Sequence, residues 1–143
     1  MFGMKTKILF SGDFAPIRGF EKIALQKKEL IFNDALEIIN EADLSFVNLE
    51  CPLTFSNKKI TKSGPCIKSN PKAIECLKPF AVIGLANNHC LDFGQEGLQD
   101  TINACNSQSL PYVGAGFGDK INKPYYWSNQ DVSIAIIAIA EKE

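Results

Sequence analysis

Short apolar runs recur along the chain and predict the strands of a sheet. They cover residues 7–11, 44–47, 81–86, 112–113 and 132–140. Turn-forming or polar residues follow most of these runs, which is typical of buried strands. The last run is almost wholly apolar, and it is expected to be a central strand of the sheet.

Stretches with helical spacing separate several of these runs. The predicted helices cover residues 28–42, 71–77 and 95–107. The apolar face of the first helix would consist of Ile31, Ala35, Ile38 and Ala42. Asn70 is expected to cap the second helix, with Pro71 in its first turn. The polar segment 54–70 has no clear period and is expected to be a loop.

The alternation of strands and helices predicts an α/β fold. Helices would cover a sheet that is at least partly parallel. The length of 143 residues fits a single domain over residues 1–143. Ligands of such sheets bind at the carboxyl ends of the strands. The residues that follow each strand are therefore the first place to look for chemistry.

The composition excludes several classes of function. Hydrophobic residues make up 45% of the chain, charged residues 22%, and the net charge is −1. No nucleic-acid binding is expected from so balanced a charge. No run approaches the ~20 apolar residues that span a bilayer, and the N-terminus does not resemble a signal peptide. A cytoplasmic location without a transmembrane segment is therefore expected. The five cysteines lack C-x-x-C spacing, which argues against a zinc ribbon.

Basic residues gather in the predicted loop, at Lys58, Lys59, Lys62 and Lys68. The favoured interpretation is a solvated loop. The alternative is a rim that steers an anionic substrate.

Polar clusters follow three consecutive predicted strands. They are Gly12-Asp13, Asn48-Leu49-Glu50 and Asn87-Asn88-His89. If the strands are parallel neighbours, these clusters meet at one edge of the sheet. Two carboxylates, amide oxygens and an imidazole suit a divalent ion such as Mn²⁺, Fe²⁺ or Zn²⁺. An Asp or Asn after a strand is more often a turn former, so the agreement of three clusters carries the hypothesis.

His89 is the only histidine in the chain. An imidazole beside a bound phosphate could donate a proton to a leaving oxygen. Asp92 is close enough in sequence either to orient this imidazole or to cap the helix that begins near Gln95. The cap is the favoured interpretation.

Several blocks of sequence resemble the CapA family, which is named for capsular poly-γ-glutamate synthesis. They are FSGDF at 10–14, ADLSFVNLECPLT at 42–54, LANNHCLDFGQEGL at 85–98 and YVGAG at 112–116. The resemblance covers nearly the whole chain, and the Asn-Leu-Glu and Ala-Asn-Asn-His blocks together are highly specific. It implies the N-terminal portion of a calcineurin-like metallophosphoesterase fold, in which two packed sheets are flanked by helices.

The resemblance also implies a function. It suggests a metal-dependent hydrolase of phosphoesterase type that acts on an anionic small molecule or polymer, with a divalent metal site, mononuclear or dinuclear. Asp13, Glu50 and Asn88 match metal ligands of the superfamily, and His89 matches its catalytic, phosphate-contacting histidine. Asn48 is a candidate to contact these ligands and not the metal itself.

Two differences from the superfamily support a noncatalytic alternative, a module that binds a polyanion or acts as a scaffold. Ala15 stands where the superfamily usually has histidine, and no histidine follows His89. The apolar run at 132–140 lies close to the last residue. The chain is therefore expected to be C-terminally truncated, with the missing half or a partner chain completing the sheet.

Overall fold

The computed structural model describes residues 5–118, 121 and 123–141, and its centre is a parallel sheet of four strands. The strands follow the order β1-β2-β3-β4 and comprise Ile8–Phe14, Leu44–Leu49, Val82–Gly84 and Tyr112–Val113. An antiparallel pair, β5 (Tyr125–Ser128) and β6 (Ser133–Ile136), forms a second small sheet. The α/β expectation is confirmed.

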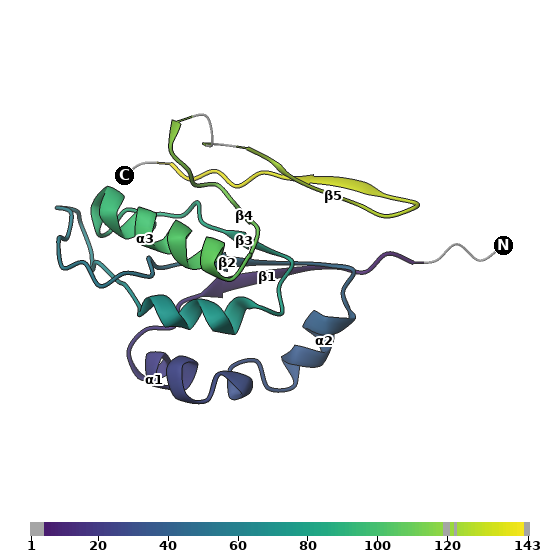
Figure 1. The fold of residues 1–143 in the computed structure, drawn as a ribbon, viewed down its shortest axis with the longest axis horizontal. Coiled ribbons are helices and arrows are strands. Elements are labelled where there is room, and N and C mark those ends of the chain that lie inside the picture. Colours follow the sequence, from purple (N-terminus) through teal and green to yellow (C-terminus); the bar gives the residue numbers. More distant parts are fainter. Residues whose placement is uncertain (1–4, 119–120, 122, 142–143) are drawn as a thin grey trace.

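Five helical segments connect the parallel strands. They are α1 (Gly19–Gln26), η1 (Lys28–Leu30), α2 (Ala35–Glu41), η2 (Pro71–Leu77) and α3 (Gly94–Ser107). Buried residues of α1, α2, η2 and α3 share one apolar cluster with β2 and β3, so these helices cover the same face of the sheet. In Figure 1, α1 and α2 lie along the lower side and the β5–β6 pair along the upper side.

The other face of the sheet packs on the β5–β6 pair. Strand alternation explains the division, because successive side chains point to opposite faces. Ile83 belongs to the helix-side cluster, whereas Val82 and Val113 join Ile136 in the second cluster. The result is three layers: helices, parallel sheet and antiparallel pair. This arrangement is consistent with part of a metallophosphoesterase-like fold.

The helix predicted over 28–42 is wrong in its extent. The chain forms η1 and α2 there, with a break at Asn33, whose φ is +41°. The break rotates the predicted face, so Ile38 is 62% exposed while Ile39 is buried. The preceding helix α1 was not predicted.

The central strand predicted over 132–140 is also wrong. Among the described residues β6 pairs only with β5. Ile134 and Ile136 face the parallel sheet, whereas Ile137 and Ile139 on the opposite face are exposed. An almost wholly apolar run suggested burial on both faces, but only one face is covered in the described structure.

Other local predictions are confirmed. The Asn70 side chain accepts a hydrogen bond from the Lys72 amide and caps η2, which begins at Pro71. Apart from an isolated bridge between Leu53 and Ser69, the segment between β2 and η2 is irregular. No helix in the described ranges is both long enough and apolar enough to cross a membrane.

Candidate functional site

The ends of β1 and β2 bring two carboxylates to one amide group. Asp13 and Asn48 are direct register partners in the parallel ladder. The Nδ2 of Asn48 donates to Asp13 Oδ1 at 2.8 Å and to Glu50 Oε2 at 2.6 Å. Asp13 is exposed, and Asn48 and Glu50 are half-buried. One amide therefore holds both carboxylates at the surface of this sheet edge.

The backbone explains this convergence. The β1–β2 register shifts between Phe10 and Asp13, so β1 continues beyond the irregularity as far as Phe14. The Glu50 amide then donates to the Phe14 carbonyl at 3.0 Å. Asp13 thus lies within β1 rather than after it, and Glu50 is anchored directly beyond the end of β2.

Asn87 links this pair of carboxylates to the segment after β3. Its Nδ2 donates to the Leu49 carbonyl at 2.8 Å and to Asn48 Oδ1 at 3.2 Å. Its Oδ1 accepts from the His89 amide at 3.0 Å. These backbone partners define the direction of the Asn87 amide. They also require Asn48 to turn its Oδ1 toward Asn87 and its Nδ2 toward the carboxylates.

The His89 ring contacts a buried carboxylate. Its Nδ1 lies 2.7 Å from Asp92 Oδ2, which also accepts from the Ile67 amide at 2.7 Å. Asp92 is 0% exposed. The predicted helix cap is wrong, because α3 begins without a side-chain cap and the Asp92 carboxylate turns back toward His89 and the loop. The alternative, contact with the imidazole, is the arrangement observed.

Lys62 is the third member of this group, and its burial disagrees with the solvated-loop interpretation. Its side chain is only 12% exposed, and its Nζ lies 2.6 Å from Asp92 Oδ1. The ammonium is not aligned for a hydrogen bond to Oδ1, which has no other partner among the described residues. Burial raises the pKa of Asp92, but Lys62, His89 and the Ile67 amide together outweigh burial and lower it.

Asn88 does not join the carboxylate pair through any hydrogen bond in the described structure. The residue is exposed, and its carbonyl accepts from Lys62 Nζ at 3.2 Å. Within the described ranges no three His, Cys, Asp or Glu side chains converge as a metal-binding group. The oxygen donors of Asp13 and Glu50 suit a hard divalent ion, so this edge fits part of a ligand shell.

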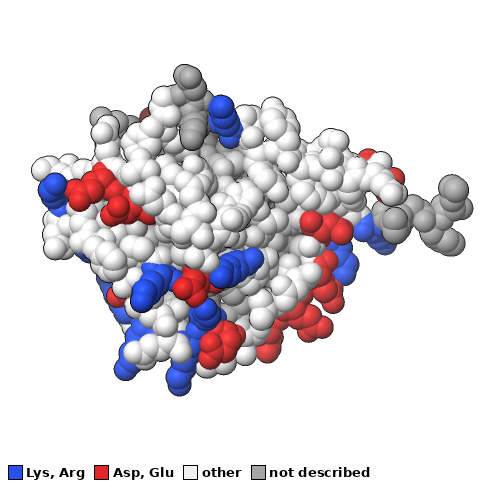
Figure 2. Space-filling view, in the orientation of Figure 1, with Lys and Arg blue, Asp and Glu red and all other residues white. Residues whose placement is uncertain are grey.

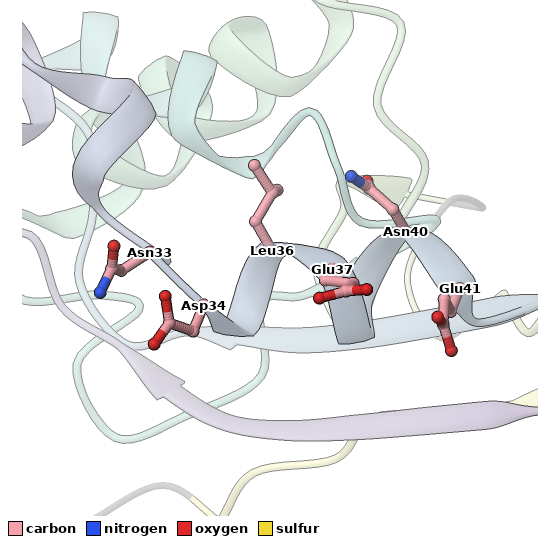
Figure 3. Close-up of a pocket in the computed structure, with 6 residues that line it drawn as sticks. All are labelled: Asn33, Asp34, Leu36, Glu37, Asn40 and Glu41. Atoms are coloured by element: carbon pink, nitrogen blue, oxygen red, sulfur yellow. The ribbon is translucent and has the colours of Figure 1, made fainter.

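Two hollows in the surface differ in their relation to these residues. A hollow of about 610 Å³ lies along α2 and the turn before it, and Figure 3 shows its six lining side chains, all from residues 33–41. None of the candidate residues lines it. A second hollow, of about 460 Å³, is lined by Lys62, Asn87 and Asn88 among others. The second hollow therefore adjoins the polar network through Asn87.

Charge on the face shown in Figure 2 is mixed. Lysine and arginine side chains lie interspersed with aspartate and glutamate, and the described residues form no continuous basic surface there. The local pairing of Lys62 with Asp92 is therefore a feature of the candidate site and not of a general basic patch.

Sequence reasoning missed two members of the network, Asn87 as its central link and Lys62 as the partner of Asp92. The position of Asn87 directly after a predicted strand was the available signal for the first. The sequence offered no signal for Lys62, which is 30 residues before Asp92 in a loop without periodicity.

Comparisons with known proteins match nearly the whole chain. A family model described as "Bacterial capsule synthesis protein PGA_cap" matches residues 7–143. The chain is 32% identical over 138 residues to "PGA biosynthesis protein CapA" of Bacillus subtilis (strain 168), covering 92% of this chain and 36% of that protein. It is 29% identical over 106 residues to "Capsule biosynthesis protein CapA" of Bacillus anthracis, covering 71% of this chain and 26% of the relative.

A similar match covers 90 residues of a probable polyglutamine synthesis accessory protein of Mycobacterium tuberculosis (strain ATCC 25618 / H37Rv), at 34% identity. It includes 59% of this chain and 23% of that protein. The chain thus spans little more than a third of the first of these relatives and about a quarter of the other two.

Proposed function

This chain belongs to the bacterial capsule synthesis protein family PGA_cap, and from that premise we propose that it contributes to a metal-dependent hydrolase of phosphoesterase type. The substrate would be an anionic small molecule or polymer, and the names of the two Bacillus relatives, for PGA biosynthesis and capsule biosynthesis, favour capsular poly-γ-glutamate or a precursor of it. One observation carries the proposal: residues at the ends of three neighbouring parallel strands form a single hydrogen-bonded network at one edge of the sheet.

Asp13 and Glu50 would hold a divalent ion such as Mn²⁺, Fe²⁺ or Zn²⁺, with Asn88 as a further ligand. A bound ion of this kind supplies Lewis-acid polarisation of an oxygen and lowers the pKa of water. The Asn48 amide positions these two ligands, since its Nδ2 donates a hydrogen bond to each carboxylate. Their mutual repulsion is reduced because each accepts a hydrogen bond from the same amide group.

His89 would act on the substrate through Nε2. Its Nδ1 is engaged by Asp92, so Nε2 is the nitrogen left for the substrate: in the neutral ring it accepts a proton, and in the protonated ring it donates one to an anionic or leaving oxygen. The contact with Asp92 also limits rotation of the ring. His89 is therefore the proposed catalytic residue, and Asp92 orients it.

Localised metal binding is the first test. Mn²⁺ broadens the NMR signals of nuclei close to it, so titration into ¹⁵N-labelled protein should broaden amides around Asp13 and Asn48 first. Asp13→Asn should remove this selective broadening, because the substitution neutralises an oxygen ligand while keeping its shape. Asp131→Asn is the matched control, since Asp131 is an exposed carboxylate in the turn between β5 and β6. Broadening that is unchanged in Asp13→Asn would refute the metal site.

Hydrolysis separates the enzyme from the noncatalytic alternative, which is favoured by the lack of three convergent acidic, histidine or cysteine ligands among the described residues. Bis-p-nitrophenyl phosphate is a suitable probe. Cleavage that requires Mn²⁺, stops on chelation and is lost in Asp13→Asn would support the hydrolase. Specific Mn²⁺ binding without cleavage would favour the polyanion-binding module.

A further inference from the structure

The loop between β2 and η2 folds back onto the turn that carries His89. The Ile60 amide donates to the Asp92 carbonyl at 3.0 Å, and the Ile67 amide donates to the Asp92 carboxylate. Between these two contacts, Lys62 reaches Asp92 and the Asn88 carbonyl. The loop is thus attached to the turn by side-chain and backbone contacts on both sides of Lys62.

Lys62 differs sharply from Lys58, which lies four residues earlier in the same loop. The side chain of Lys58 is 84% exposed and pairs with Glu96 at the surface. Lys62 is 12% exposed and pairs with a carboxylate that is completely buried. Withdrawing an ammonium group from water is unfavourable unless a charged partner compensates, so the position of Lys62 requires Asp92. Asp92 in turn contacts no basic side chain other than Lys62 and His89 among the described residues.

The pair determines which ring nitrogen of His89 carries a proton. Asp92 is ion-paired with Lys62, and an ionised carboxylate can only accept hydrogen bonds. The 2.7 Å contact between Asp92 Oδ2 and His89 Nδ1 therefore requires a proton on Nδ1. Lys62 Nζ also lies 3.3 Å from Nδ1, but Nδ1 cannot accept from it while it donates to Asp92.

We propose that Lys62 is a positioning residue: by occupying Asp92 Oδ1 and the Asn88 carbonyl, it fixes His89 as the Nδ1–H tautomer and leaves Nε2 for the substrate. The use of Nε2 rests on the proposed function, whereas the tautomer itself does not. The loop thereby becomes part of the site, although Lys62 touches no reacting atom.

The tautomer can be read directly, because His89 is the only histidine. Long-range ¹H–¹⁵N NMR spectra distinguish a protonated from an unprotonated ring nitrogen, and here they contain signals from a single ring. Recorded at alkaline pH without metal or substrate, the unsubstituted protein should show one tautomer with its proton on Nδ1. A proton on Nε2 would overturn the proposal without the need for any variant.

Variants then assign the effect to Lys62. Lys62→Met keeps most of the aliphatic length but removes the ammonium, and the single-tautomer pattern should be lost, with both forms populated. Lys62→Arg should restore the Nδ1–H form as the major one, and Lys58→Met should leave the spectrum unchanged. A folded Lys62→Met protein, with dispersed amide signals and the full Nδ1–H pattern, would show that Asp92 positions the ring alone. None of these results depends on metal binding or hydrolysis, so the two proposals fail separately.

Discussion

At Gly114 the end of the parallel sheet packs closely against the segment after β6. Replacement of this glycine by alanine should therefore destabilise the protein. It follows β4 directly, and its φ is +82°. A Cβ at this position would lie 2.5 Å from Ala86 Cβ, 2.8 Å from Ala138 Cβ and 3.0 Å from the Ala138 carbonyl oxygen. These atoms belong to the backbone or are fixed to it, so the clash cannot be relieved by rotating a side chain.

Gly64 provides a control with nearly the same φ angle. Its φ is +88°, and a Cβ there would meet nothing within 4 Å. Alanine in the left-handed region costs roughly 1–2 kcal/mol. Loss of backbone freedom in the unfolded chain offsets about 0.4–1 kcal/mol of that cost. Gly64→Ala should therefore destabilise by about 0–1.6 kcal/mol.

Gly114→Ala adds the steric term. Overpacking in a closely packed region costs about 1–3 kcal/mol, so the total should be about 1–5 kcal/mol. Urea denaturation of both variants and the unsubstituted protein gives these differences, provided the denaturant slopes agree. Free energies of unfolding that differ by less than about 0.5 kcal/mol between the two variants would refute the close approach of Ala86 and Ala138.

Two further predictions concern buried groups. Burial raises the pKa of the Cys51 and Cys105 thiols to about 12, so iodoacetamide should label partly exposed Cys66 first, as peptide mapping by mass spectrometry can check. Equal labelling of Cys51 in the folded protein would contradict this burial. Asp92→Asn should destabilise by about 3 kcal/mol because it breaks a buried ion pair. The pKa of Asp92 in the folded protein is lowered from 3.8. The difference in unfolding free energy between the two proteins, measured in urea, should therefore be complete above pH 3.8 and shrink as the pH falls through the folded-state pKa. A difference that grows in acid would contradict this prediction.

The meeting of Asp13, Asn48 and Glu50 could be predicted from sequence because one rule governs it. Neighbouring parallel strands present their carboxyl ends at the same edge, so polar residues after successive strands come together. The same rule did not indicate which of two adjacent asparagines faces inward. The turn after β3 directs Asn87 to the Leu49 carbonyl and leaves Asn88 exposed.

Other features depend on contacts that no local pattern contains. Lys62 lies in the same aperiodic, mostly polar loop as the exposed Lys58 and Lys59, and the folding of the loop onto Asp92 distinguishes it. Helical spacing over 28–42 was real but discontinuous, because Asn33 adopts a left-handed conformation within it. Periodicity indicates that apolar residues recur, and it does not reveal a break that changes their direction.

The amide relay from Asp13 through Asn48 and Asn87 to the His89 backbone has a thermodynamic consequence. Asn48 Nδ2 already uses both carboxylates as acceptors, so a cation that draws on those oxygens competes with it. Rotation of Asn48 would in turn remove an acceptor from Asn87, whose other end holds the His89 amide. Binding of a cation at the carboxylates and binding of a ligand near His89 would then be linked by a coupling free energy. Linkage makes that coupling reciprocal, so each ligand would change the affinity for the other by the same factor.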